Sequence, residues 1–194
     1  VDFLNGDIQY TTNSYGNINV IKEGYPVNSW YLYEAIGLFQ SVDEVKNSPF
    51  QHAKTAPGDI KYRDVNNDNK IDINDMRVLG RSIPKYTYGF NTDLDYKGFD
   101  MGAFFQGVQG IDIYPTNNVS WAFFNGAGVT KDQLVNSWTP ENPSAKYPRF
   151  FEPKRGSQIN SNNSTFWLKD ASYLRLKNLQ LGYSIPSELL KKIN

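Results

Sequence analysis

The alternation of side chains between Tyr86 and Val108 constrains the fold more than any other feature of this sequence. Six residues occupy every second position of its first half, namely Tyr86, Tyr88, Phe90, Thr92, Leu94 and Tyr96. A period of two is typical of a β-strand with two different faces and does not fit a helix. Lys97-Gly98 follows and can form a two-residue turn, because Gly readily adopts a positive φ. The sequence therefore predicts an antiparallel hairpin over residues 86–108.

The turn also predicts the register of this hairpin. Tyr96 should lie opposite Phe99 and Phe90 opposite Phe105, which makes one face apolar across both strands. The other face carries carboxylates and must be hydrated, because an unpaired charge is costly to bury. Two interpretations remain open at this point: a half-exposed sheet of a soluble sandwich, or a strand pair of a membrane barrel.

The length of the first strand favours the barrel. Ten steps of about 3.3 Å, tilted by about 40°, span roughly 25 Å, the height of the apolar band of an outer-membrane barrel. The aromatic residues at both ends would form its interfacial girdles. We expect the lipid-facing residues to be Tyr88, Phe90, Leu94, Tyr96, Met101 and Phe105. We expect the lumen to be lined by Asn91, Asp93, Asp95, Asp100 and Gln106.

Composition agrees with an all-β chain and excludes several functions. Aromatic residues make up 15% of the 194 residues, which favours strands. The formal net charge is zero, so no global field attracts nucleic acid. The absence of cysteine excludes thiolate chemistry, and the single His52 leaves little for a multi-histidine metal site. No apolar run approaches the roughly 18 residues of a transmembrane helix, and no signal peptide is visible after Val1, so we expect a processed or internal piece.

The remaining elements are less regular. Trp30–Phe39 predicts one aromatic-rich strand, Ser41–Asn47 one helical turn, and Ser187–Ile193 a short capped turn. Between Ser172 and Tyr183 the odd positions change from charged to apolar. Either a strand leaving a bilayer or a strand with a bulge near Asn178 would show this pattern.

Two long segments, 40–85 and 110–166, predict large irregular loops. Unstructured connections of this size are uncommon in compact domains unless they are functional. Long loops on one side and a two-residue turn on the other are the asymmetry of outer-membrane barrels. We therefore expect both segments to be extracellular loops, 86–108 to be a transmembrane hairpin, and 167–185 to be a barrel strand.

The segment from Asp64 to Asp75 fits a twelve-residue calcium loop. The predicted ligands are Asp64, Asn66, Asp68, Asp72 and Asp75, with the backbone carbonyl of Lys70. All of these donors are hard oxygens, which suit Ca²⁺. Asn69 stands where Gly is usual, although Asn tolerates a left-handed conformation, and Asp75 replaces the usual Glu. Because long flanking helices are missing, the ion would stiffen a loop; the alternative is an Asx-rich turn without an ion.

Other residues carry weaker signals. His52 lies in a polar stretch and is expected to be solvated. Trp121, Phe123 and Phe124 could stack on a sugar or peptide, or could pack their own loop. Trp138 begins a Pro-rich rigid turn. The sequence contains no P-loop and no nucleophile elbow.

Seven segments, taken in order, resemble the C-terminal part of the SusC/RagA family of TonB-linked outer-membrane proteins of Bacteroidetes. They are Glu23-Gly24-Tyr25-Pro26-Val27, Gly58-Asp59-Ile60-Lys61-Tyr62-Arg63-Asp64, Ile83-Pro84 before Tyr88-Gly89, Tyr96-Lys97-Gly98-Phe99-Asp100, Phe104-Phe105-Gln106-Gly107-Val108-Gln109-Gly110, Trp138-Thr139-Pro140-Glu141-Asn142-Pro143, and Ser172-Tyr173-Leu174-Arg175-Leu176-Lys177-Asn178-Leu179. The resemblance covers the chain from about Glu23 onward.

This resemblance implies a 22-stranded transport barrel with an N-terminal plug in the outer membrane. It implies import of glycans, oligosaccharides or peptides, with a SusD-like lipoprotein as lid and with energy delivered through TonB, and it implies no enzymatic activity. The expected partners are the lipoprotein, TonB through a missing N-terminal region, the substrate and outer-membrane lipid, but no nucleic acid. Since 194 residues cannot supply 22 strands of about ten residues each, residues 1–194 are expected to be a partial C-terminal barrel region.

Two alternatives come from other classes. One is a soluble secreted carbohydrate-binding module with a dockerin-like calcium loop. The other is a glycan-cleaving enzyme, which needs two carboxylates about 5 to 10 Å apart.

Overall fold

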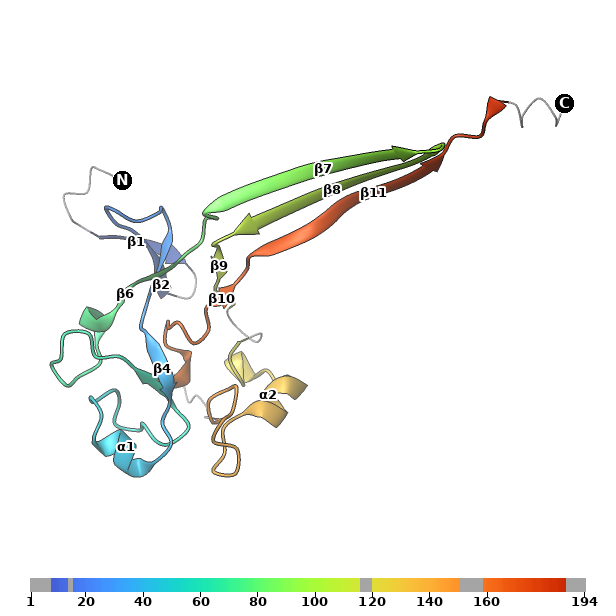
Figure 1. Ribbon diagram of the computed structural model, residues 1–194. Helices are drawn as coiled ribbons and strands as arrows, with labels where there is room; N and C mark the ends of the chain where they lie inside the picture. The colour runs from blue at the N-terminus through green and yellow to red at the C-terminus, as the bar shows by residue number, and fades with distance from the viewer. Residues whose placement is uncertain (1–7, 14–15, 116–119, 151–158, 188–194) are drawn as a thin grey trace. The chain divides into compact units, whose positions relative to one another are not determined.

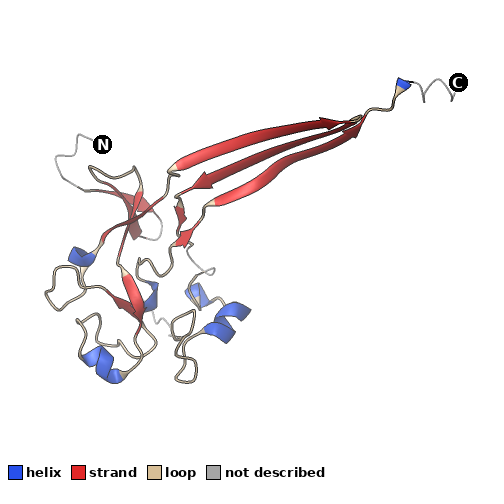
Figure 2. Cartoon of the chain, in the orientation of Figure 1, coloured by secondary structure: helices blue, strands red, loops and turns tan. Residues whose placement is uncertain are grey.

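The computed structural model describes residues 8–13, 16–115, 120–150 and 159–187, and it consists mostly of strands and loops with a few short helices (Figure 2). This confirms the prediction of an all-β chain. Contacts divide the chain into two compact units. Unit 1 comprises Val1–Ser82 and Ile113–Lys169, and unit 2 comprises Ile83–Asp112 and Asp170–Asn194. Within the described ranges, none of the helices has the length and apolarity needed to cross a membrane.

Unit 2 is a three-stranded antiparallel sheet in the order β11, β8, β7 (Figure 1). Its strands are β7 (Tyr86–Tyr96), β8 (Phe99–Gln109) and β11 (Tyr173–Tyr183), with 11 residues each. The predicted hairpin register is confirmed along the whole length of β7 and β8. Lys97 and Gly98 have φ angles of 48° and 85°, the two positive values that a type I′ turn requires.

Strand β11 contains a β-bulge. Its pairing with β8 shifts between Leu176 and Asn178, so that Lys177 is an extra residue. The extra residue reverses the alternation, so the odd positions before and after it lie on different faces. The bulge near Asn178, one of the two predicted explanations, is confirmed.

Unit 1 contains a four-stranded sheet in the order β1, β2, β3, β6 and a separate two-stranded sheet of β4 and β5. These strands are β1 (Gln9–Asn13), β2 (Gly16–Ile21), β3 (Ser29–Leu32), β6 (Arg77–Arg81), β4 (Ala35–Leu38) and β5 (Ile60–Tyr62). The predicted single strand over 30–39 is wrong, because β3 and β4 join different sheets. Between them Tyr33 bonds through its backbone to Asn163 and Thr165 at 2.9 Å each, which diverts the chain.

The segments 40–85 and 110–166 are more structured than predicted. The first contains α1 (Val42–Lys46), β5, η1 (Ile73–Asp75) and β6. The second contains β9 (Asp112–Ile113), η3 (Phe124–Gly126), α2 (Lys131–Asn136) and η4 (Ile159–Ser161). Helix α1 confirms the predicted helical turn, and the hydroxyl of Ser41 caps it by accepting the N–H of Glu44 at 3.1 Å.

The predicted strand over 167–185 is divided into β10 (Lys169–Asp170), which pairs with β9, and β11. Ala171 separates them, and its N–H donates to the carbonyl of Ile111 at 2.9 Å. The predicted turn over Ser187–Ile193 lies, apart from Ser187, outside the described residues.

Unit 1 has a hydrophobic core drawn from distant segments. Its buried members are Leu32, Ile60, Tyr62, Tyr114, Trp121 and Trp167. Burial raises the pKa of the Tyr62 and Tyr114 hydroxyls, because the charged form is poorly solvated there. Trp121 therefore packs its own loop instead of presenting its ring to solvent, the second of the two roles that the sequence left open. The long segments are packed parts of a unit with its own core.

Candidate functional site

One face of the sheet in unit 2 is apolar across all three strands. It carries Tyr88, Phe90, Leu94 and Tyr96 of β7, Phe99, Met101, Ala103 and Phe105 of β8, and Leu174, Leu176, Leu179, Leu181 and Tyr183 of β11. Most of these side chains are exposed, with 74% for Leu181, 69% for Tyr96 and 63% for Phe99. Rings stack across the strands, and the Phe90 and Phe105 centroids lie 4.7 Å apart. A patch of this extent marks a surface that binds another apolar phase.

The bulge brings the leucines of β11 onto this face. Leu174 and Leu176 lie opposite Gly107 and Phe105, before the bulge, and Leu179 lies opposite Ala103, after it. Residues directly opposite in an antiparallel pair project to the same side. Without the extra residue, half of these leucines would lie on the polar face.

The other face is mostly polar, although Phe104 and Val108 also lie on it, and it contains the predicted lumen-lining residues. Asn91, Asp93, Asp95, Asp100 and Gln106 all lie on it, as the hairpin register requires. Strand β11 adds Arg175, Asn178 and Gln180, which the sequence analysis missed because the bulge hides their phase. Asp95 lies directly opposite Asp100, and like charges in that position are tolerated only where water or counter-ions screen them. This face is therefore built for a hydrated environment.

Glycines allow side chains to lie over neighbouring strands. On the apolar face, the Tyr88 ring covers Gly107, where a Cβ atom would come within 2.6 Å of it. On the polar face, Asp93 lies over Gly102 at 3.1 Å from a Cβ built there. Because glycine has no side chain, these two positions leave room for Tyr88 and Asp93 to lie against the neighbouring strand.

The outer edges of this sheet are open within the described ranges. β7 and β11 each pair only with β8 there. Each has 11 residues, contains no proline and presents a row of backbone donors and acceptors. An edge of this length is a template for a further strand.

The predicted calcium loop is closed by its own hydrogen bonds. The N–H groups of Asn67 and Asn69 donate to the two carboxylate oxygens of Asp64 at 2.7 and 2.8 Å. Both asparagines are left-handed, with φ of 59° and 64°, which confirms that Asn69 can replace Gly at this position. Asn66 and Asp68 likewise accept the N–H groups of Asp68 and Lys70, at 3.0 and 2.9 Å.

The second half of the loop is tied in the same way. Asp75 is buried and accepts the N–H groups of Val65 and Asp72, both at 2.8 Å. The Lys70 ammonium donates to Asp72 at 2.7 Å, which lowers the pKa of Asp72 and raises that of Lys70. Among the described residues, no group of three or more His, Cys, Asp or Glu side chains is arranged to hold a metal. These contacts are those of an Asx-rich turn, and the calcium site stays a prediction.

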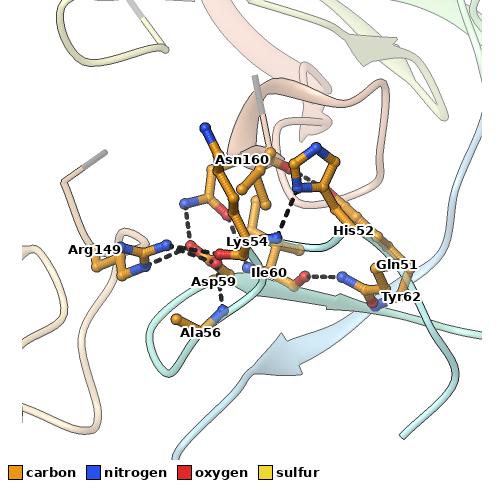
Figure 3. A network of polar contacts seen from close by, with 10 residues as sticks. Gln51, His52, Lys54, Ala56, Asp59, Ile60, Tyr62, Arg149 and Asn160 are labelled. Atoms are coloured by element: carbon orange, nitrogen blue, oxygen red, sulfur yellow. Dashed lines mark hydrogen bonds and ion pairs between the residues drawn. The ribbon is translucent and has the colours of Figure 1, made fainter. Parts of the chain in front are cut away.

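A buried carboxylate in unit 1 was missed by the sequence analysis. Asp59 is fully buried and accepts hydrogen bonds from Arg149 Nε at 2.7 Å, the terminal Arg149 nitrogen at 3.0 Å, Asn160 at 2.9 Å and the N–H of Ala56 at 2.9 Å (Figure 3). Four donors compensate the desolvation of the charge. The pair with Arg149 spans 90 residues of sequence, and no local pattern indicates such a partner.

Nearby side chains extend this Asp59 network along β5. Gln51 donates to the carbonyl of Ile60 at 2.9 Å and accepts the N–H of Tyr62 at 2.8 Å, as an additional strand would (Figure 3). His52 is exposed, and its Nδ1 accepts the N–H of Lys54 at 3.0 Å, which confirms a solvated histidine. The arrangement joins separate loops of unit 1.

Gly58 precedes Asp59 and lies under the Trp138 ring. Its φ is +87°, and a Cβ atom there would come within 2.4 Å of the ring. Trp138 begins the predicted turn, which the N–H of Asn142 closes by donating to Thr139 at 2.9 Å. The two halves of unit 1 are thus held together by both an ion pair and ring packing.

Several known proteins are similar in sequence to this chain. No protein-family model matches it. TonB-dependent receptor P3 of Formosa agariphila is 33% identical over 173 residues, which cover 89% of this chain and 16% of that receptor. TonB-dependent receptor P26 of the same organism is 30% identical over 187 residues, covering 96% and 18%. The TonB-dependent receptor SusC of Bacteroides thetaiotaomicron is 25% identical over 167 residues, covering 86% and 14%.

The chain therefore spans less than a fifth of the length of each of these relatives. They are receptors, so they lend no support to a soluble carbohydrate-binding module or to a glycan-cleaving enzyme. Over most of its length, this chain is a relative of one segment of the TonB-dependent receptors, SusC among them.

Proposed function

We propose that this chain forms part of the wall and of the outward-facing loops of a TonB-dependent importer in the outer membrane. The observation that carries the proposal is the two-faced sheet of unit 2. Its apolar face is exposed over three strands, and its opposite face gathers carboxylates and amides. Lipid on one side and a water-filled pore on the other satisfy both faces at once.

Energetics support lipid as the partner of the apolar face. Removing a large apolar side chain from water gains about 1.5–3 kcal/mol. This face carries many such side chains, and unit 2 hides almost none of them by itself. Strands of 11 residues match the 9–11 residues or so that a tilted strand needs to cross a bilayer. The open edges of β7 and β11 would pair with other strands of a longer receptor.

The polar face supports a proposal about the substrates. Hydroxyl-rich or amide-rich solutes suit a lining of Asn, Gln and Asp side chains. We therefore propose glycans, oligosaccharides or peptides as substrates, energy supplied through TonB, and no enzymatic activity. Segments 40–85 and 110–166, most of which belong to unit 1, would lie outside the cell and contact a SusD-like lipoprotein. Calcium at 64–75 would stiffen the loop there.

Adjacent cysteine substitutions test the proposal. The chain contains no cysteine, so single cysteines at Asp93 and Leu94, or at Gln180 and Leu179, can be read without background from it. In a receptor containing this chain and reconstituted in liposomes, a water-soluble maleimide should modify Asp93→Cys and Gln180→Cys. It should leave Leu94→Cys and Leu179→Cys unmodified.

The control is the same receptor unfolded in denaturant, where all four cysteines should react. Equal labelling of both members of each pair in liposomes, or preferential labelling of the leucine positions, would refute the assignment of the faces.

A further inference from the structure

The apolar face of unit 2 contains an open groove at the end where the turn between β7 and β8 lies. The groove has a volume of about 530 Å³. That volume lies within the range of small-molecule sites, roughly 300–1,000 Å³. Its side chains form two rows of directly opposed residues across the three strands, and Asp100 and Gly182 complete the lining between the rows. The rows are Leu94, Met101 and Leu181, and Tyr96, Phe99 and Tyr183.

The groove is suited to a hydrocarbon chain. The row nearest the turn is aromatic, and the Phe99 and Tyr183 rings pack against each other with their centroids 4.5 Å apart. The row behind it is aliphatic or thioether, so it offers neither a charge nor a hydrogen-bond donor. Asp100 adds its carboxylate to the polar face and not to this one, as its pairing with Asp95 requires. Burial of methylene groups is therefore the favourable interaction that this surface can make.

A cation stands at the turn end of the groove. Lys97 follows Tyr96 in the chain, and its ammonium lies 5.2 Å from the centre of the Tyr96 ring. The side chain is exposed, and within the described ranges it forms no ion pair with a carboxylate. The nearest carboxylates along the strands, Asp95 and Asp100, lie on the opposite face. An ammonium with free donors beside an apolar groove is complementary to an anionic group that is attached to a hydrocarbon chain.

We propose that this groove binds one phospholipid, with an acyl chain along Leu94, Met101 and Leu181 and with its phosphate held by the ammonium of Lys97. The inference rests on the proposed function, because lipid reaches this face only if the sheet is part of a barrel wall. The short turns of outer-membrane barrels face the periplasm, so the phospholipid belongs to the periplasmic leaflet. The aromatic row then lies at the level of the headgroups, where such rings are enriched.

The site requires both parts of the ligand. A free phosphate ion meets one exposed cation here, and a single exposed charge pair is weak in water. A diacylglycerol fills the groove but leaves the ammonium without its partner. A lipid that is bound at this site therefore differs from the bulk bilayer, whose molecules only cover the apolar face.

A titration in detergent tests the proposal. Ser184 is exposed, and its N–H donates to the carbonyl of Gly98 at 2.6 Å, so a label there reports on the turn. We would attach a polarity-sensitive fluorophore to Ser184→Cys in an otherwise cysteine-free receptor that contains this chain, and add dioleoylphosphatidylglycerol. The emission should shift to shorter wavelength and saturate. Dioleoylglycerol and inorganic phosphate should each require at least about tenfold higher concentrations for the same shift.

Matched substitutions separate the charge from the groove. Lys97→Asn removes the cation but keeps the turn, because Asn is favoured at the first central position of a type I′ turn. It should weaken binding by about fivefold, as expected for one lysine near a lipid surface. Lys85→Asn is the control, because the Lys85 ammonium lies 5.3 Å from the centre of the Tyr86 ring at the other end of β7. That variant should keep the wild-type affinity.

A second pair of variants tests the aliphatic row. Leu181→Ala removes part of the groove wall and should weaken binding by about threefold. Leu174→Ala makes the same change on the same face but at the opposite end of β11, and should leave the affinity unchanged.

Three results would overturn the phospholipid site: equal affinity for dioleoylglycerol and dioleoylphosphatidylglycerol, equal affinity of the two lysine variants, or equal affinity of the two leucine variants. The maleimide labelling described above tests the proposed function separately. If the faces are labelled as expected and one of these results is obtained, only the phospholipid site is wrong, whereas labelling of the leucine positions removes both proposals. If Lys97→Asn does not fold, the wild-type titrations with the two lipids still decide the question.

Discussion

The two units of this chain differ in where their apolar side chains lie: unit 1 buries them, and unit 2 exposes them. Unit 1 has short strands and long loops, yet it buries a core of six large side chains and a fully bonded carboxylate. Unit 2 has the longest and most regular strands, but among its described residues only Ala103 and Gly107 are buried. Regular secondary structure and a hydrophobic core are therefore separable properties. Unit 1 stabilises itself, whereas unit 2 has a surface that only an external apolar phase can satisfy.

The largest expected effect comes from breaking the polar centre of unit 1. Asp59→Ala removes the fully buried carboxylate that accepts two hydrogen bonds from Arg149, and it should lower the free energy of unfolding of unit 1 by about 3–5 kcal/mol. Chemical denaturation followed by the fluorescence of Trp121 and Trp167 measures this change. If the two units are independent, the spectroscopic signal of the β-strands of unit 2 should persist in this variant.

Asp43→Ala on exposed helix α1 is the matched control and should change the stability by less than about 0.5 kcal/mol. Loss of unit 2 together with unit 1 in Asp59→Ala would show that the two units do not keep their structure independently.

The second-largest loss of folding free energy is expected from a charge on the apolar face of unit 2. Leu179→Arg places a charge near the middle of β11 and should cost about 2–4 kcal/mol of folding free energy in a bilayer. Gln180→Arg, one residue along and on the polar face, should be nearly neutral. Titrating the fraction folded in lipid vesicles separates the two variants, and equal costs would contradict the lipid assignment.

A smaller effect is expected from calcium. If the loop at 64–75 binds Ca²⁺ with the dissociation constant of about 10⁻⁴–10⁻³ M found in extracellular modules, 10 mM Ca²⁺ should stabilise unit 1 by roughly 1.4–2.7 kcal/mol. Thermal unfolding with Ca²⁺ and with equal Mg²⁺ measures this difference. Asp68→Asn should reduce the Ca²⁺ effect, while Asp43→Asn should preserve it. An identical transition with and without Ca²⁺ would leave the Asx-rich turn as the correct interpretation.

The smallest effect concerns an exposed ion pair in unit 1. Hydrogen bonds from Lys146, Tyr147 and Asn136 lower the pKa of Asp132 to about 2. Because the pKa is lower in the folded state, the pair stabilises the fold above the ordinary value of 3.8 and loses this contribution as the pH falls toward 2. An NMR titration of the Asp132 carboxyl should show the low midpoint. Lys146→Met should raise that midpoint; an unchanged midpoint would mean that the lysine is not the main cause.

The sequence predicted the hairpin well because its information is local. A period of two, a Lys-Gly turn and one strand length suffice to define the register from Tyr86 to Gln109. The same is true of α1, whose cap Ser41 lies next to the helix that it begins. The family resemblance was confirmed for the same reason, since its motifs are short and ordered.

The remaining features depend on partners that lie far apart in the sequence. The break between β3 and β4 is caused by a segment 130 residues later, whose Thr165 hydroxyl accepts the N–H of Ala35. Arg149 could not be paired with Asp59 from spacing alone. The sequence left the faces of β11 open between two explanations, because the position of a bulge is decided by the strand beside it. Of the polar face, the residues of the hairpin were found from the sequence, and those that β11 adds were not.

The single extra residue in β11 also changes how mutations in this strand should be read. With Lys177 deleted, the leucines on one side of that position would exchange places with Arg175 and its polar neighbours, although no hydrophobic residue would have been lost. The number of residues in this strand is therefore constrained as strongly as their identity. Substituting Lys177 changes one side chain, whereas deleting it would move every side chain in half of the strand to the opposite face of the sheet.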